Sequence, residues 1–339
     1  MRVTLTQVAQ RAGVSLASAS RALNGESASP RTVENVRRAA RELAYLPDAR
    51  AQSLKLGSTR QLAFAVADVG NPVYVEMMRA VEETVREEGY RVLISSTGSA
   101  EAGEIELLHG LGRGYADGLI LSPLRITDAL LAELVRLPLA VVVVGLLPAS
   151  TQVDNVRANS AAGVRLAVEH LVSLGHRRLG LVNGPLDTTP GRVRGAAFAS
   201  ACHDAGLPTG AAPAVVADDF TFEAGIKAAR QLLKRHPSLD AVVAANDLLA
   251  TGAYHAAFDL GRDVPADLAV VGMDDSALAS QLHPTLTSVS LGSAERGRRA
   301  AELLLARLRD PGRKATRVVV QPRLAVRQST AVTSNRGRR

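Results

Sequence analysis

The chain has 339 residues, of which 47% are hydrophobic and 3% aromatic, and its formal net charge is +7. This length exceeds one ordinary domain and predicts two or three. The apolar runs are shorter than the roughly 20 residues of a membrane-spanning helix, which excludes such a helix. The single cysteine, Cys202, excludes an intramolecular disulfide and fits a reducing compartment. No basic and then apolar leader opens the sequence, so we expect a soluble cytoplasmic protein.

Two short helices are the first predicted elements. Apolar residues recur at the i, i+3, i+4 and i+7 spacing of one helix face, at Leu5, Val8, Ala9 and Ala12. Thr4 and Gln7 match a capping box. Gly13 can take the left-handed conformation of a turn, and Ser15 can cap a second helix. In that helix we expect Leu16, Ala19 and Leu23 to point inward. The pair predicts a helix-turn-helix.

The outward face of the second helix carries small residues, hydroxyls, one Arg and one Asn, namely Ala17, Ser18, Ser20, Arg21 and Asn24. Small side chains let a helix enter the major groove, hydroxyls and amides bond phosphates, and Arg can read guanine. Residues 1–60 hold ten Lys and Arg against four Asp and Glu, so nearly all of the net charge lies there. This distribution favours a DNA-binding module over an ordinary helical hairpin.

A third helix and a short linker follow. Ser29 can cap the helix with Pro30 at its first position. Its expected buried stripe is Val33, Val36, Ala40 and Leu43. The segment Asp48–Leu56, before Gly57, is too short to be a stable helix alone. We expect it to order only on DNA or against a partner copy.

From Gln61 onward, buried strand patterns alternate with helical stripes in two series, the second beginning near His176. This alternation predicts two doubly wound parallel sheets with helices on both faces, forming two lobes with a cleft between them. The motif RVVVQPRLAVRQ predicts a last strand pair that crosses between the lobes. Ligands in such folds lie beyond the carboxyl ends of the strands.

Polar or aromatic residues follow several strands directly: Asp68, Ser122, Asn183, Asp219, Phe220, Asn246, Asp247, Asp274 and Asp275. Together they favour a cleft for a sugar-like or heterocyclic ligand, with Phe220 able to stack on a ring. For each residue alone, a helix cap or turn is the alternative. We find no dinucleotide, phosphate-loop, serine-hydrolase or zinc-protease motif, so we expect neither an enzyme nor a metal or cofactor.

The residues reached so far resemble the lactose-repressor (LacI/GalR) family of bacterial transcription regulators, over about residues 3–330. The matching blocks are VTLTQVAQRAGVSLASASRALNG, LAYLPDARAQSLKLG, GHRRLGLVNGP, AANDLLATGA and AVVGMDD. The resemblance implies a small all-α helix-turn-helix domain at 1–47 and a hinge helix and linker at 48–60. An α/β two-lobed, periplasmic-binding-protein-like domain for ligand binding and dimerisation follows at 61–330, and a basic tail at 331–339. Lobe 1 would comprise about 61–159 and 291–320, and lobe 2 about 160–290 and 321–330.

The family match implies a cytoplasmic repressor, nucleoid-associated when bound, that binds a palindromic double-stranded DNA operator as a homodimer. A small-molecule effector in the cleft would control its DNA affinity; the effector is a sugar or sugar derivative, with a purine-like molecule as the alternative. Implied phosphate contacts are Ser15, Ser18, Ser20, Asn24 and Tyr45, and implied base contacts are Leu16, Ala17 and Arg21. Ala51, Leu54 and Lys55 match the hinge helix in the minor groove, with Leu54 as a kinking wedge. Implied effector contacts are Tyr74, Ser122, Arg192, Phe220, Asn246 and Asp274.

Departures from the family pattern include Asp48 at the hinge start and Gly145, which leaves the effector's orientation open. The tail lacks a leucine heptad, so we expect a dimer and no tetramer. Two other functional classes are alternatives, and the first of them has the same two-lobed body. A solute-uptake sugar-binding protein would lack residues 1–60, and an enzyme acting on a sugar or nucleotide would turn its bound ligand over.

Overall fold

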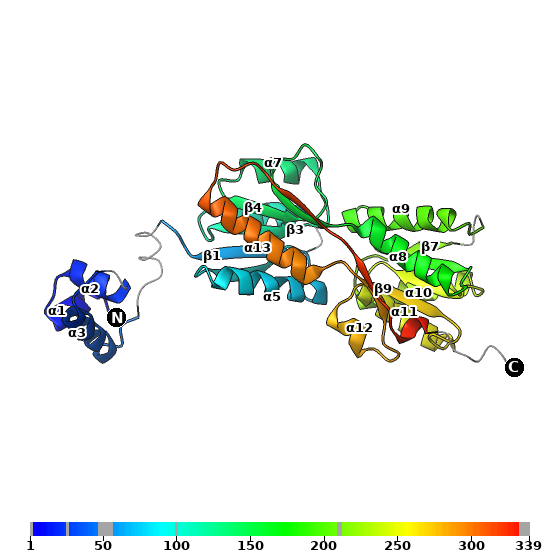
Figure 1. Cartoon of the computed structure of the whole chain (residues 1–339), viewed down its shortest axis with the longest axis horizontal. Coiled ribbons are helices and arrows are strands. Elements are labelled where there is room, and N and C mark those ends of the chain that lie inside the picture. Colours follow the sequence, from blue (N-terminus) through cyan, green and yellow to red (C-terminus); the bar gives the residue numbers. More distant parts are fainter. Residues whose placement is uncertain (1–2, 25–26, 47–56, 99–100, 209–211, 332–339) are drawn as a thin grey trace. The chain divides into compact units, whose positions relative to one another are not determined.

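The computed structural model describes residues 3–24, 27–46, 57–98, 101–208 and 212–331 (Figure 1). The chain divides into two compact units, Met1–Thr59 and Arg60–Arg339. The predicted hinge contacts Ala51, Leu54 and Lys55, the substitution Asp48 and nearly all of the basic tail lie outside the described residues. Among the described helices, none combines the length and the apolar character that crossing a membrane requires.

The described residues of the first unit form three helices, α1 (Leu5–Ala12), α2 (Leu16–Asn24) and α3 (Pro30–Glu42). The predicted capping box is confirmed, because the Thr4 amide donates to Gln7 Oε1 at 2.8 Å and the Gln7 amide donates to Thr4 Oγ1 at 3.4 Å. Gly13 ends α1 with φ +67°, a left-handed value that favours glycine. The helices meet in a core of small apolar residues: Val8, Ala9, Ala19, Ala22, Val36 and Ala39.

The inward position expected for Leu16 is wrong. Leu16 is 51% exposed, whereas Ala19, one turn further along α2, is 0% exposed. Leu16 is the first residue of α2, and Val14 of the preceding turn packs against the core at that end. A leucine is therefore left on the outer surface of the helix-turn-helix.

The second unit contains two six-stranded sheets, which confirms the predicted pair of doubly wound sheets. The first sheet has the order β11-β5-β4-β3-β1-β2 and is parallel throughout. Its strands are β1 (Gln61–Val66), β2 (Arg91–Ser96), β3 (Gly118–Ser122), β4 (Ala140–Val144), β5 (Asp154–Ala158) and β11 (Arg317–Val320). Its helices are α5 (Pro72–Arg86), α6 (Glu101–Leu111), α7 (Asp128–Arg136) and α13 (Ser293–Arg309).

The second sheet has the order β12-β10-β9-β8-β6-β7, with β12 antiparallel to β10. Its strands are β6 (Leu179–Asn183), β7 (Ala214–Val216), β8 (Ala241–Ala244), β9 (Ala269–Asp274), β10 (Thr287–Ser290) and β12 (Arg323–Ala325). Its helices are α8 (Ser160–Ser173), α9 (Thr189–Asp204), α10 (Phe222–Arg235), α11 (Asp247–Asp259), α12 (Ala277–Gln281) and the 3-10 turn η1 (Gln328–Thr330).

Each sheet separates two apolar clusters. Helices α5 and α13 lie side by side on one face of the first sheet, and α6 and α7 cover the other (Figure 1). The second sheet has α10 and α11 on one face and α8 and α9 on the other. We call the first sheet with its helices the first lobe and the second sheet with its helices the second lobe.

The chain crosses between the lobes at three places. It leaves the first sheet after β5, returns between β10 and α13, and crosses again between β11 and β12. The last crossing confirms the strand pair predicted from RVVVQPRLAVRQ. Two of the crossings are tied together, since Asn159 Nδ2 donates to Gln321 Oε1 at 3.3 Å. Strands that end at the same edge then place their following residues around one cleft.

Candidate functional site

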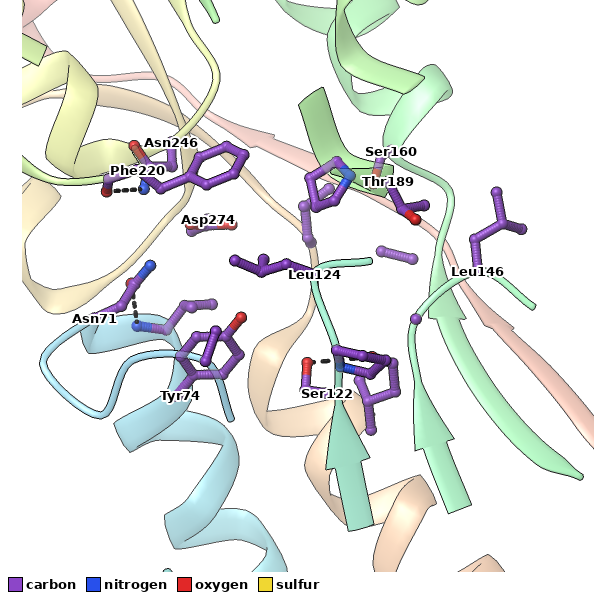
Figure 2. Close-up of a pocket in the computed structure, with 18 of the residues that line it drawn as sticks. Asn71, Tyr74, Ser122, Leu124, Leu146, Ser160, Thr189, Phe220, Asn246 and Asp274 are labelled. Atoms are coloured by element: carbon purple, nitrogen blue, oxygen red, sulfur yellow. Dashed lines mark hydrogen bonds between the residues drawn. The ribbon is translucent and has the colours of Figure 1, made fainter. Parts of the chain in front are cut away.

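A cavity of about 450 Å³ lies between the two lobes, at the carboxyl ends of the strands (Figure 2). Residues after β1, β3 and β4 and the first turn of α5 form its first-lobe wall. The start of α9, the loop after β7, the start of α11 and the end of β9 form its second-lobe wall. Five of the six residues predicted to contact an effector line it: Tyr74, Ser122, Phe220, Asn246 and Asp274. Their role as ligand contacts stays a prediction.

The first-lobe wall presents neutral hydroxyl groups. Ser122, at the end of β3, is buried and donates from Oγ to the Val144 carbonyl at 3.1 Å. Burial raises the pKa of the Tyr74 phenol, an effect that the neighbouring Ser122 hydroxyl partly opposes. Tyr74 is therefore a neutral phenol at physiological pH, able to donate to and accept from a ligand hydroxyl.

The aromatic side of the second-lobe wall is held in place by its neighbours. Asn246 caps α11, accepting from the Leu249 amide at 2.8 Å, and its Nδ2 donates to the Phe220 carbonyl at 3.0 Å (Figure 2). The Phe220 ring lies over Gly184, where an added Cβ would be 2.2 Å from the ring. Asn246 is thus both a helix cap and a clamp on the loop that presents the ring.

Asp274 and Arg194 form the charged centre of the cavity. Asp274 ends β9 and is 6% exposed, and its φ of +109° is a strained value for a residue with a side chain. Arg194 is 8% exposed; its Nη1 donates to the Ala245 carbonyl, and its Nη2 lies 4.0 Å from Asp274 Oδ1. Burial raises the pKa of the Asp274 carboxyl, while the Arg194 and Arg296 guanidiniums oppose this shift. At 4.0 Å the two side chains attract without a direct hydrogen bond, so both keep bonding capacity for a ligand.

The position implied for Arg192 is wrong. Arg192 is exposed and does not line the cavity, whereas Arg194 does. Successive helix residues turn by about 100°, so residues two apart point to nearly opposite sides. The buried stripe of α9, at Gly191, Arg194, Phe198, Ala201 and Cys202, includes Arg194 at helical spacing. That periodicity in the sequence was the signal that could have selected it.

Of the other polar residues expected at strand ends, Asp68 and Asp219 line the cavity and three do not. Asn183 donates from Nδ2 to the Gly191 carbonyl at 2.8 Å, and Asp275 pairs with Arg327 at 2.7 Å. Asp247 is buried beneath the wall, accepting from two serines. These three bond other groups of the protein and do not line the cavity, and none of them is the helix N-cap that was the alternative. Sequence reasoning missed Arg157 and Arg296, which also line the cavity.

Two contacts join the lobes beside the cavity. The Thr189 amide donates to the Leu124 carbonyl at 2.8 Å, and Arg125 Nε donates to Asp187 Oδ2 at 2.8 Å. Leu124 and Arg125 follow β3 in the first lobe, whereas Asp187 and Thr189 stand at the start of α9 in the second. Any change in the angle between the lobes must alter these bonds, so the described conformation is held closed along this side.

The buried Asp247 carboxyl predicts a pH dependence of stability. Its oxygens accept from the Ser276 amide and hydroxyl at 2.7 and 2.8 Å and from the Ser288 hydroxyl at 2.6 Å. Burial raises its pKa from 3.8 to about 7, and the charge of Asp274 acts in the same direction. Between these values the folded state holds a proton that the unfolded state has released, so the unfolding free energy falls as pH rises.

We therefore expect the thermal midpoint of the protein to fall between pH 5 and pH 8, and the fall to be smaller in Asp247→Asn. The exposed variant Asp218→Asn is the control and should follow the natural chain. Differential scanning calorimetry at both pH values measures the difference. Equal slopes in all three proteins would show that Asp247 is ionised throughout.

The residues predicted to contact DNA lie on or next to α2 and after α3 of the first unit. Leu16, Ala17 and Arg21 are exposed on α2. Ser15 caps α2 by accepting from the Ser18 amide at 3.1 Å, and Asn24 Nδ2 donates to Ser20 Oγ at 3.3 Å. Tyr45 is half-buried against the helical core. The hydroxyl and amide groups of α2 are exposed or half-buried on a helix without a carboxylate, while Arg11 pairs with Glu42 of α3 at 2.6 Å.

Comparisons with known proteins cover both units. Residues 4–48 match the family model "Bacterial regulatory proteins, lacI family", and residues 168–330 match "Periplasmic binding protein-like domain". The ribose operon repressor of Escherichia coli K12 is 34% identical over 330 residues, covering 96% of this chain and 99% of that protein.

Two solved structures extend the likeness to nearly the whole chain. The lac repressor dimer bound to operator and the anti-inducer ONPF has a TM-score of 0.85 at 28% identity, covering 98% of this chain and 100% of that one. The CelR–cellobiose complex has a TM-score of 0.72 at 32% identity, covering 97% and 100%. The chain belongs to the LacI family of bacterial regulatory proteins.

Proposed function

We propose that this protein is a transcriptional repressor that binds a palindromic operator as a homodimer and changes its DNA affinity when a small molecule binds between its lobes. The observation that carries the proposal is the joining, in one chain, of an acid-free helix-turn-helix surface to a closed polar cavity. Two relatives support it, since one is a ribose operon repressor and another is a lac repressor dimer bound to operator.

In the proposed complex, α2 lies in the major groove. Ser15, Ser18, Ser20 and Asn24 bond phosphates, with Tyr45 as a further backbone contact. Leu16, Ala17 and Arg21 face the base edges, where an exposed leucine can contact a thymine methyl group and Arg can bond guanine. Ala51, Leu54 and Lys55 form the minor-groove contact, with Leu54 as the wedge. Two copies place two such helices about one helical turn apart.

In the proposed effector complex, the cavity holds a sugar or sugar derivative. The Phe220 ring offers an apolar face, while Tyr74, Asn246 and Asp274 offer hydroxyl, amide and carboxylate groups to ring hydroxyls. The CelR relative is described with cellobiose, a carbohydrate. The ligand is released unchanged, as expected of a regulator. Because the operator is chromosomal, we place the protein in the bacterial cytoplasm and on the nucleoid when bound.

Sequencing the genomic fragments that the full-length protein retains identifies the operator. The variant Arg21→Ala then tests whether α2 is the recognition helix. We expect this variant to bind operator about 10- to 100-fold more weakly and to lose preference at one base pair, because a guanine contact supplies about 1–3 kcal/mol. Fluorescence anisotropy measures both effects. The control Arg41→Ala removes the same charge from α3. Equal losses in the two variants would mean that Arg21 contributes charge alone and reads no base.

A further inference from the structure

Arg296, in the first turn of α13, is an unpartnered cation in the cavity wall. It lines the cavity, its Nε is buried without a hydrogen-bond partner, and it forms no ion pair with any residue in the described parts of the chain. Its helical neighbours differ. Arg298 bonds Glu302 at 2.6 Å, and Arg299 bonds Glu295 at 2.9 Å. The carboxylates of α13 therefore pair with Arg298 and Arg299, and neither of them pairs with Arg296.

Arg194, on the opposite lobe, adds a second open donor. Its Nη1 is used by the Ala245 carbonyl, but its Nε is buried without a partner. Two guanidiniums thus have free Nε–H groups at the same cavity, one from each lobe. Burial lowers the pKa of both guanidiniums, an effect opposed by the Asp274 charge. A guanidinium stays protonated in proteins, so both remain positive.

The negative charges of the cavity do not balance this pair. Asp274 is the single buried carboxylate among the lining residues. Glu76 of α5 also acts on Arg296 by its charge, but it is exposed, accepts a hydrogen bond from Ser293 Oγ and forms no ion pair with Arg296. Asp68 is exposed and accepts from the Gly70 amide at 2.8 Å, and Asp219 is half-buried and accepts from the Phe220 amide at 2.7 Å. Arg194 is buried and Arg296 is half-buried. Leaving such a partly desolvated cation without a partner is costly, and a neutral hydroxyl offers only a dipole in return. A carboxylate or phosphate neutralises the charge and fits the planar guanidinium.

We propose that the effector is an anionic sugar derivative, a sugar acid or a sugar phosphate, whose charged group binds Arg296 of the first lobe and Arg194 of the second. This inference rests on the proposed function, since it names the class of ligand for that cavity. The neutral part of the ligand lies against Phe220 and Tyr74, which Figure 2 shows on the two sides of the cavity. Because the two arginines come from different lobes, the anion also ties the lobes together.

The first test needs no knowledge of the sugar. Thermal unfolding of the full-length protein is followed with inorganic phosphate and with acetate, each compared with chloride at equal ionic strength. We expect phosphate or acetate at millimolar concentration to raise the melting temperature of the natural chain and of Arg299→Met, and to have no effect on Arg296→Met. Equal shifts in the natural chain and Arg296→Met, or no shift with either anion, would overturn the proposal.

The second test uses matched sugars in calorimetric titrations: glucose with gluconate and glucose 6-phosphate, and ribose with ribose 5-phosphate. We expect an anionic member to bind at least about 10-fold more tightly than its neutral parent, and the carboxylate and phosphate arms decide between the two anions. Arg296→Met should reduce the anion's affinity by about 10- to 100-fold and should reduce the affinity of the neutral parent sugar much less. Arg296→Lys, which keeps the charge, should lose less.

The outcomes separate this inference from the proposed function. Tight binding of an uncharged sugar that alters operator affinity, with its charged derivatives binding more weakly, would overturn the anionic ligand and leave the repressor intact. Saturable binding of an anionic sugar that depends on Arg296 but never alters operator affinity would support the anion site and reject the proposed regulation.

Discussion

Arg194→Met is expected to abolish the response to effector while operator affinity stays within about twofold of the natural chain. The guanidinium lines the cavity, lies 4.0 Å from Asp274 Oδ1 and has no hydrogen-bond partner at Nε, so we expect it to bond the ligand. Its loss removes charge-assisted hydrogen bonds worth about 1.5–3 kcal/mol each, so effector affinity should fall at least about 100-fold. Operator affinity should persist because the α2 surface lies in the other compact unit.

Arg192→Met is the matched control for this prediction. Arg192 stands two residues earlier on the same helix and is exposed. Titration calorimetry for the effector and anisotropy for the operator should find this control unchanged in both. Arg194→Met also leaves the Ala245 carbonyl without its hydrogen-bond donor, which should lower the stability of the variant. Both measurements must therefore be made below the melting temperature of the variant. A normal effector response in Arg194→Met, or its loss in Arg192→Met, would contradict the assignment.

Gly252→Ala is expected to lower the unfolding free energy by about 3 kcal/mol or more. An added Cβ at Gly252 would lie 2.5 Å from the backbone of Gly225 and Ile226, so α10 and α11 would have to separate. These helices cover one face of the second sheet, and Asn246, the N-cap of α11, lies in the cavity wall. Effector affinity should therefore fall along with stability.

Gly110→Ala in α6 is the control for that clash. Nothing lies within 4 Å of a Cβ added there. Alanine has less conformational freedom than glycine in the unfolded chain. The unfolding free energy of this variant should therefore be unchanged or higher by up to about 1 kcal/mol. Urea unfolding followed by circular dichroism compares the two. If both variants unfold at the same urea concentration as the natural chain, the contact between α10 and α11 is looser than described.

The apolar strands were predictable because a strand buried on both faces is a continuous apolar run, as in QLAFAV and LGLVN. The strand β5, with the sequence DNVRA, was missed because two of its three buried residues, Asp154 and Asn155, are polar. Asp154 is buried only because Arg307 bonds it at 3.0 Å, and Asn155 because its Nδ2 bonds the Gly145 carbonyl at 2.7 Å. These partners are distant in sequence, so no local pattern reveals them.

The same contrast applies to the cavity. Ser122, Asn246 and Asp274 follow apolar strands directly, and the rule for parallel sheets selected them. Arg194 lies on the buried stripe of α9, which its helical spacing could have indicated, whereas the place of Arg296 in the wall depends on the angle of α13 to the sheet. An arginine near an aspartate and an arginine on an open surface look identical in the sequence. The charge balance of the cavity therefore required the folded arrangement.

The central claim is that ligand in the cavity changes DNA binding by the other unit. The most direct measurement is the operator Kd of the full-length natural chain and of Asp274→Asn, with and without the tightest ligand from the sugar panel. We expect the ligand to shift the natural chain's Kd by about 5- to 150-fold, the usual range of such coupling. Asp274→Asn should bind the operator equally well and show no shift. An operator Kd that stays constant while the ligand saturates the cavity would contradict the claim.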